Sequence, residues 1–427
     1  MTGIAPSAPA TKREHRVFGR QTGIVLVGQI LRALTAALLF VVGARALGPG
    51  GFGVFVSTMA VAAVVVPFGS LGSINLMMRH IAVRPEDAAV GFSSALVITA
   101  ASGAVFVTGM AAVQEATGLL NTTGWTVLLI GSADLLAYRL AELSGAARQA
   151  QDWMYGTAFF PVFVNGSRVA ALAVLSGTGS VSLSAFAVTY LVASAAAAGV
   201  IVVWTLFRLG LVRPRPMMFL GQWREGLHFS VGLASQSVYN DVDKVMLARL
   251  ASDASAGVYA SAYRAIDLAC VPLRAIFGAA YIRYFRAGTA GLRGTMRVAR
   301  ELFAPSLAAA VVSALLLLAA ADLLPLLLGS EFTEAAGIAR WLAIIPVLRA
   351  LHYIPADSLT GAGMQGVRTA CQLGVAVLNV LLNLALIPAF GISGAVASSI
   401  ATDAVLACAL WAVVVRRLRT IPAAEKG

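Results

Sequence analysis

The chain is predicted to be an all-α polytopic membrane protein, with about twelve transmembrane helices in two six-helix lobes. Of its 427 residues, 59% are hydrophobic and only 12% are charged, which is about half the charged share of soluble domains. The apolar runs are long and continuous, whereas barrel strands would alternate over about 10 residues. Arginine is concentrated in the short segments between these runs.

Each apolar run is long enough to cross the membrane, because a bilayer core needs roughly 20 apolar residues per helix. In chain order the expected spans are Gly23–Leu47, Phe52–Met77, Ala89–Val113, Trp125–Ala147, Tyr155–Leu175, Val181–Phe207, Leu227–Leu250, Gly257–Arg283, Ala304–Leu328, Ala336–Pro355, Val367–Ala389 and Ser393–Val415. Prolines inside several spans predict bends, since proline removes a backbone hydrogen bond. These prolines are Pro67, Pro161, Pro272, Pro305 and Pro346.

The distribution of arginine predicts the orientation of the chain. Every second connection is basic, as in the stretch that holds Arg208, Arg213 and Arg215, whereas the opposite connections, such as 114–124 and 329–337, contain no lysine or arginine. By the positive-inside rule both termini are cytoplasmic, in a multi-pass protein of the cell (inner) membrane. The net charge of +12 therefore records membrane orientation. Nucleic-acid binding is not expected, because no extended basic domain is present.

The spans divide the chain into four regions. Residues 1–19 are expected to form a cytoplasmic basic tail, 20–212 an N-terminal six-helix lobe, 213–226 a cytoplasmic linker, and 227–427 a C-terminal six-helix lobe with a short basic cytoplasmic tail. Since six helices return the chain to its starting side, the two lobes have the same topology.

An internal repeat supports this division. With an offset of 204, Val41–Arg45 aligns with Val245–Arg249, and Gly53-Val54-Phe55 aligns with Gly257-Val258-Tyr259. Two lobes with the same topology form a parallel repeat, which places the substrate path between them.

Polar and ionisable residues inside the expected spans are the candidates for function, because a charge at a helix centre costs on the order of 2.5–3.5 kcal/mol. We predict that a water-filled substrate cavity between the lobes is lined by Arg32, Arg168, Asn240, Asp243, Lys244, Arg264 and Asp267. Helical spacing places Gln236, Asn240 and Asp243 on one face of their span. Lys244 is the only lysine outside the two tails.

Structural roles compete with this interpretation. Arg139 and Glu142, and likewise Arg264 and Asp267, are three residues apart and could form local ion pairs. Arg349 and His352 lie near the inner end of their span, where snorkelling to the interface competes with a proton relay at His352. Asp403 is alone in its span and is as compatible with a packing hydrogen bond as with an ion ligand.

The sequence lacks the signatures of enzymes and of metal sites. It has no Walker A, HExxH or GxSxG pattern, so no catalytic residue, cofactor or intrinsic ATP motor is expected. Cys270, Cys371 and Cys408 stand apart in apolar segments, which predicts neither a disulfide framework nor a zinc site. A membrane polymerase or ligase of glycans is the alternative from another class, but it should carry a long outer loop with catalytic residues.

Two motifs resemble those of a known family. The segment Ala44–Phe55 resembles the R-x-L-G-P-x-x-F-G-x-Y/F signature of Wzx-type polysaccharide flippases, which belong to the multidrug/oligosaccharidyl-lipid/polysaccharide exporter superfamily. The run Asp243–Arg249, followed by Gly257–Arg264, is similar to that family's D-x-x-x-L-(G/A)-R … G-x-Y-x-x-A-x-R pattern. The resemblance extends over nearly the whole chain and agrees with two six-helix lobes.

The resemblance implies a flippase that moves a polyprenyl-diphosphate-linked oligosaccharide from the inner to the outer leaflet, by alternating access. Arginines in a water-filled cavity would then contact the diphosphate. The implied partners are this lipid-linked oligosaccharide, the bilayer, and possible further membrane proteins of polysaccharide assembly. Within the same superfamily, a drug or metabolite antiporter and a lipid II flippase are the alternatives.

Overall fold

The structure, a computed structural model, describes residues 12–151, 153–221 and 223–420. Within them the chain is 89% helical and contains no strand, which confirms the predicted all-α class. Of the predicted N-terminal tail 1–19, the structure describes only residues 12–19. Residues 1–11 and 421–427 lie outside the described residues. The helices form two compact units, each described by itself below.

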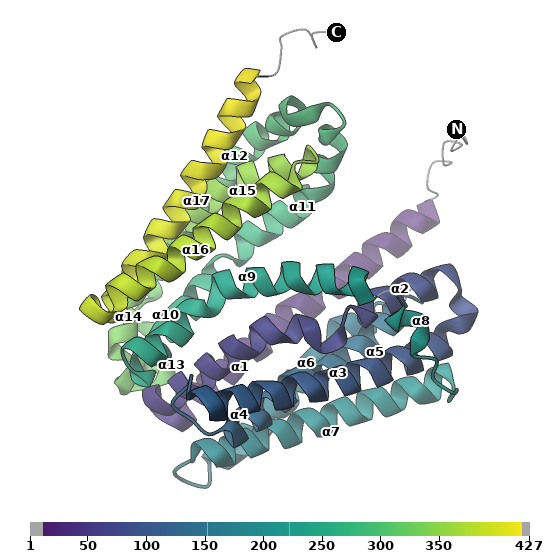
Figure 1. Ribbon diagram of the computed structural model, residues 1–427. Coiled ribbons are helices and arrows are strands. Elements are labelled where there is room, and N and C mark those ends of the chain that lie inside the picture. The colour runs from purple at the N-terminus through teal and green to yellow at the C-terminus, as the bar shows by residue number, and fades with distance from the viewer. Residues whose placement is uncertain (1–11, 152, 222, 421–427) are drawn as a thin grey trace. The chain divides into compact units, whose positions relative to one another are not determined.

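Unit 1 contains the described residues of Met1–Val42, Val65–Ala112 and Trp125–Gly232. After the first part of α1 (Lys12–Val65), its helices are η1 (Val66–Ser70), α2 (Ser73–Val83), η2 (Pro85–Asp87), α3 (Ala88–Thr117), α4 (Gly124–Gly131), η3 (Ser132–Tyr138), α5 (Arg139–Gln149), α6 (Tyr155–Ser176), α7 (Leu183–Leu209) and α8 (Met217–Leu220). The long helices α6 and α7 pack along each other (Figure 1). The segment η3 is a π-helix between α4 and α5, a form that occurs mostly as short bulges at functional sites.

Unit 2 contains Gly43–Val64, Val113–Gly124 and the described residues of Leu233–Gly427. Its helices are the second part of α1, α9 (Trp223–Leu250) from Leu233 onward, α10 (Asp253–Ala269), α11 (Val271–Gly288), α12 (Gly291–Ala320), α13 (Leu323–Leu328), η4 (Ser330–Phe332), α14 (Thr333–Leu342), α15 (Ile345–Gly361), α16 (Gln365–Phe390) and α17 (Ile392–Thr420). The last two helices, α16 and α17, lie side by side (Figure 1), and α15 packs against both. The six-helix lobe boundaries predicted from the sequence stay a prediction.

The helix α1 changes direction at Gly48, whose φ of 63° and ψ of 176° are not helical. Only glycine adopts a positive φ there at little cost, and Pro49 follows directly inside the helix. The two expected spans Gly23–Leu47 and Phe52–Met77 therefore meet at this kink. The apolar part of this segment, Val27–Ser70, has 44 residues and is about 66 Å long at the rise of an α-helix, enough for two crossings of a bilayer core.

Among the described residues, seven helices are long and apolar enough to cross a membrane, or eight if a bent pair counts as one span. The bent pair joins Ser330–Leu342 to Ile345–Gly361 at an angle of 44°. The remaining expected spans are helical but charged or broken: α4–η3–α5, α9, and α10 with α11. The membrane-spanning class is thus confirmed, and the count of twelve stays a prediction.

Two predicted bends coincide with helix ends. Pro272 and Pro346 each stand at the start of a helix, α11 and α15, where the missing N–H of proline costs nothing. The expected span Gly257–Arg283 is consequently interrupted at Cys270, between α10 and α11.

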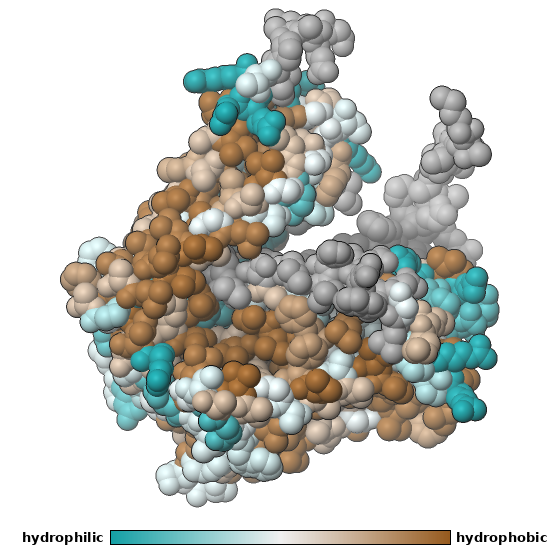
Figure 2. All heavy atoms as spheres, viewed as in Figure 1, coloured by the Kyte–Doolittle hydropathy of each residue, from teal (hydrophilic) through white to brown (hydrophobic). Residues whose placement is uncertain are grey.

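Large apolar side chains cover the outer surface of the helices. On α16, Val377, Leu381 and Leu384 are 61%, 57% and 51% exposed, and Figure 2 shows hydrophobic residues over α16 and α17. An exposed apolar surface of this extent is not stable in water, so lipid surrounds these helices. The protein is a multi-pass membrane protein.

Candidate functional site

One polar cluster of unit 1 is centred on Arg168 of α6. Its side chain is buried, with a residue exposure of 3%. The guanidinium donates from Nη2 to the Asp134 carboxylate at 2.8 Å and to the Ala133 carbonyl at 3.1 Å, and from Nε to the Ser194 hydroxyl at 2.7 Å. Because Asp134 and Ala133 belong to η3 and Ser194 to α7, one arginine connects three helical segments.

Tyrosine rings complete this unit 1 cluster, which comprises Asp134, Tyr138, Arg168, Tyr190 and Ser194. The Tyr190 hydroxyl donates to the Asp134 carboxylate at 3.0 Å. The Arg168 guanidinium lies over the Tyr190 ring at 4.2 Å and over the Tyr138 ring at 5.3 Å. Cation–π contacts of this kind stabilise a buried guanidinium group. The charge of Arg168 is therefore stabilised both by the Asp134 carboxylate and by two tyrosine rings.

Arg32 on α1 lies beside this cluster and has a different environment. Its guanidinium is 5.9 Å from the centre of the Tyr138 ring, and the side chain is only partly buried. Among the described residues no carboxylate lies within ion-pair distance of Arg32. The predicted pair of Arg139 with Glu142 is confirmed at 2.5 Å, so Arg139 is locally neutralised and Arg32 keeps its charge available.

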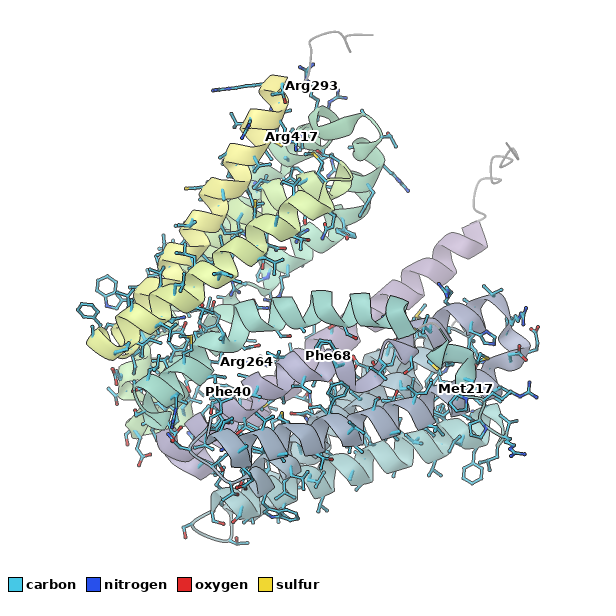
Figure 3. All side chains as sticks on the ribbon, in the orientation of Figure 1. Phe40, Phe68, Met217, Arg264, Arg293 and Arg417 are labelled. Carbon is cyan, nitrogen blue, oxygen red and sulfur yellow. The ribbon has the colours of Figure 1, made fainter. Side chains whose placement is uncertain are left out.

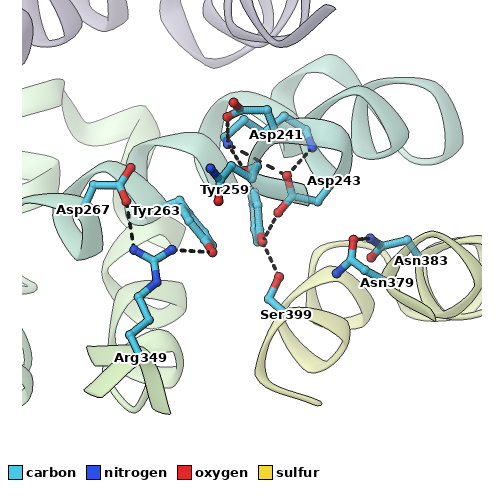
Figure 4. Close-up of polar contacts among 11 residues, drawn as sticks. Asp241, Asp243, Tyr259, Tyr263, Asp267, Arg349, Asn379, Asn383 and Ser399 are labelled. Carbon is cyan, nitrogen blue, oxygen red and sulfur yellow. Dashed lines mark hydrogen bonds and ion pairs between the residues drawn. The ribbon is translucent and has the colours of Figure 1, made fainter. Parts of the chain in front are cut away.

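A second polar network lies in unit 2 and connects side chains of α9, α10, α15 and α17 (Figure 4). Asp243 on α9 is 5% exposed, and its carboxylate accepts a hydrogen bond of 2.6 Å from Tyr259 on α10. The Tyr259 hydroxyl also lies 2.7 Å from the Ser399 hydroxyl on α17. A chain of hydrogen bonds thereby connects three helices through residues that the membrane would otherwise disfavour.

Lys244 neighbours Asp243 and is neutralised within its own helix. Its ammonium group lies 2.5 Å from the Asp241 carboxylate and 3.9 Å from that of Asp243. The same ammonium group lies 5.1 Å from the centre of the Tyr263 ring on α10. Asn240 is exposed one turn away, and its carbonyl accepts a further hydrogen bond from Lys244 at 3.0 Å.

Asp267 forms an ion pair with Arg349, which the sequence suggested would lie at the membrane interface. Its carboxylate lies 3.2 Å from the guanidinium of Arg349 on α15, and Arg349 also donates to the Tyr263 hydroxyl at 3.0 Å. Arg349 is 8% exposed, so the snorkelling expectation is wrong: this arginine is fixed inside the helix packing. The local pair of Asp267 with Arg264 is also wrong, since the ion-pair partner of the Asp267 carboxylate comes from another helix.

Arg264 remains the half-buried cation of α10 (Figure 3). Its Nε atom is buried and has no hydrogen-bond partner among the described residues. Within the part of the chain that the structure describes, Asn240, Arg264 and Arg32 are the predicted site residues whose polar groups are least occupied, whereas Arg168, Asp243, Lys244 and Asp267 are engaged. The side chain of Gln236 lies outside the described residues.

Sequence reasoning missed the tyrosines. Tyr138, Tyr190, Tyr259 and Tyr263 each contact one of the predicted ionic residues Arg168, Asp243 and Lys244. An uncharged phenol is not found in a search for charges. The spacing of Tyr259 and Tyr263 by one helical turn next to Asp267 was the available signal. Within the described residues, no three His, Cys, Asp or Glu side chains gather as a metal site would require.

Comparison with known proteins places this arrangement in a family. The profile described as "Polysaccharide biosynthesis protein" matches residues 18–285, more than half of the chain. No functionally curated sequence is significantly similar to the chain.

Several solved structures share the fold. An inward-facing multidrug resistance MATE family transporter of the MOP superfamily superposes with a TM-score of 0.73 at 14% identity, covering 92% of this chain and 98% of that chain. The lipid II flippase MurJ, in an inward closed conformation, gives a TM-score of 0.71 at 11% identity over 94% and 88% of the two chains. A MOP superfamily transporter from Pyrococcus furiosus gives 0.55 at 13% identity over 94% and 95%. The chain thus has the fold of MOP superfamily transporters, and it belongs to the polysaccharide biosynthesis protein family.

Proposed function

We propose that this protein is a flippase, which moves a polyprenyl-diphosphate-linked oligosaccharide from the inner to the outer leaflet for the assembly of cell-surface polysaccharide. The observation that carries the proposal is the match to the polysaccharide biosynthesis family in a chain made of membrane helices with a transporter fold. The glycan and its diphosphate must cross about 30 Å of hydrocarbon, which they cannot do without a polar path.

Alternating access supplies such a path without a continuous pore. The substrate head group would enter a polar cavity from one side, while the prenyl tail stays in lipid. Arg32, Asn240 and Arg264 are the residues proposed to meet the head group directly, because their polar groups are the least occupied. Lys244 and Asp267 would border the cavity, and the buried Arg168 and Asp243 would hold its walls in place.

A reconstituted flipping assay tests the proposed activity. The purified protein would be placed in liposomes with a fluorescent polyprenyl-diphosphate oligosaccharide, and the fraction of glycan accessible to an external lectin would be followed over time. Parallel liposomes with lipid II and with a cationic dye address the two alternatives within the superfamily. Movement of lipid II or dye without movement of the oligosaccharide would contradict the proposal.

Substitution of Arg32 by alanine is expected to reduce the flipping rate at least tenfold. The reason is that the Arg32 guanidinium, which has no ion-pair partner among the described residues, offers a strong charge-assisted contact to a diphosphate. Arg213→Ala is the matched control, because Arg213 is an exposed arginine of the connection that follows α7. Equal rates for the two variants would remove Arg32 from the proposed substrate path.

The orientation of the chain is a further prediction. We propose that both termini are cytoplasmic in the inner membrane, because the basic connections mark the inner side. Single cysteines at the exposed positions Arg213 and Arg297 should react with an impermeant maleimide only after the cells are opened. Cysteines at Thr122 and Glu331 should react in intact cells. The reverse pattern would invert the topology.

A further inference from the structure

Two arginines and two tryptophans gather at one end of unit 1, where α5 and α7 end. The Arg148 guanidinium lies 5.1 Å from the ring centre of Trp153 and 5.7 Å from that of Trp204. Arg208 lies over the same Trp204 ring at 5.6 Å. We call these four residues the headgroup cluster. Tryptophan and arginine at a helix end are typical of the membrane–water interface.

The two positive charges of the headgroup cluster are close enough to affect each other. Burial, and then the neighbouring charge of Arg208, lower the pKa of Arg148 below its ordinary value. Among the described residues neither guanidinium forms an ion pair. The Arg148 Nε atom is also buried without a hydrogen-bond partner. Two like charges held around one indole are stabilised by an anion.

An apolar groove runs between α6 and α7 toward this cluster. It has a volume of about 610 Å³ and is lined by Phe163, Ser167, Ala170, Ala171, Val174, Ala193, Ala196, Ala197 and Val200. From Phe163 to Val174 it extends about 16 Å along α6, close to half of a bilayer core of about 30 Å.

The groove and the headgroup cluster are adjacent along the same two helices. Trp204 follows Val200 by one helical turn on α7, and Phe160 precedes Phe163 by three residues on α6. Phe160 also packs edge-on against Trp204, with 5.8 Å between ring centres. A molecule with an anionic head and an apolar chain would span both features.

We propose that the headgroup cluster and the groove form one binding site for an anionic phospholipid. The phosphate-bearing head group lies against Arg148 and Arg208, and one acyl chain lies in the groove of α6 and α7. Charge complementarity selects this occupant, because a zwitterionic lipid brings a cation of its own and adds no net negative charge beside the two arginines. By the predicted orientation the lipid belongs to the cytoplasmic leaflet, where anionic lipids attract basic residues.

Native mass spectrometry of the purified full chain tests this site. The protein in detergent would be titrated with phosphatidylglycerol and, separately, with phosphatidylcholine of the same acyl chains. We expect one phosphatidylglycerol to be retained at least fivefold more tightly than phosphatidylcholine. Arg148→Gln and Arg208→Gln should each reduce that ratio by about fivefold, since a basic residue near an anionic head group contributes about 1 kcal/mol. Filling the groove with Ala196→Phe should weaken retention of both lipids.

Matched variants separate a defined site from general attraction to lipid. Arg417→Gln removes an exposed arginine at the end of α17 (Figure 3), and Ala195→Phe enlarges an exposed alanine of α7 outside the groove. Both should bind like the unsubstituted protein. The proposal is overturned if Arg417→Gln costs as much as Arg148→Gln, or if phosphatidylcholine binds equally well. Displacement of phosphatidylglycerol by an equimolar polyprenyl phosphate would also overturn it, because the site would then belong to the substrate.

Discussion

Replacement of Arg168 by methionine is expected to lower the free energy of unfolding by about 3–5 kcal/mol, the range for breaking a buried ion pair. Methionine fills part of the volume, but it leaves the Asp134 carboxylate without its cation. The Ala133 carbonyl and the Ser194 hydroxyl lose a donor at the same time. Thermal unfolding of the purified protein, followed by tryptophan fluorescence, measures the loss.

The exposed pair of Arg340 and Asp322 provides the control for Arg168. Its atoms are as close, at 2.6 Å, but the two side chains are 47% and 74% exposed. Arg340→Met should therefore cost no more than about 1 kcal/mol. Adding Asp134→Leu to Arg168→Met should recover part of the stability, because no unpaired charge then remains. If the double variant is less stable than Arg168→Met alone, then the unpaired Asp134 carboxylate does not cause the loss of stability in Arg168→Met.

The positions of the membrane helices could be predicted from the sequence because each run of apolar residues reports directly on lipid contact. The helix ends at the breaks between α10 and α11 and between α14 and α15 could not. There the chain breaks within an apolar run, at Cys270 and between Leu342 and Ile345, and only the proline that follows each break marks it. The π-helix η3 has no signal in the sequence.

The charged residues of the site could be found, but not their partners. Helical spacing identifies neighbours on one helix, as for Arg139 and Glu142, and says nothing of other helices. The partner of Arg168 is 34 residues away in the chain, and that of Asp267 is 82 residues away. Pairing of this kind is set by helix packing, so Arg168, predicted to line the cavity, turns out to be neutralised by a residue of another helical segment. Lys244 differs, because its partner Asp241 lies three residues away on the same helix.

Gly257→Ala is expected to destabilise unit 2 by about 1–3 kcal/mol, the usual cost of overpacking. A Cβ atom at Gly257 would lie 2.3 Å from the Pro49 carbonyl oxygen, and one at Gly53 would lie 1.6 Å from the Asp253 carbonyl oxygen. Both obstacles are backbone atoms, so no side chain can turn away to make room. Gly50→Ala is the control. Gly50 lies three residues before Gly53 on α1, and a Cβ atom at Gly50 would meet nothing within 4 Å.

The internal repeat relates the contacts of Gly53 and Gly257 to each other. The stability of the double variant therefore tests the repeat more directly than either single variant does. The offset that aligns Gly53 with Gly257 also aligns Pro49 with Asp253. The contact of Gly257 with Pro49 therefore corresponds to the contact of Gly53 with Asp253, as equivalent contacts do across a two-fold axis. The Ser57 and Ser261 hydroxyls repeat the pattern: Ser57 donates to the Gly53 carbonyl and Ser261 to the Gly257 carbonyl, each at 2.8 Å.

Once an alanine at either glycine has separated α1 from α10, an alanine at the other glycine should cost little further stability. The double variant Gly53→Ala with Gly257→Ala should therefore lose clearly less stability than the sum of the single losses. Additive losses would mean that the two contacts are independent, and the structural basis for the repeat would fall.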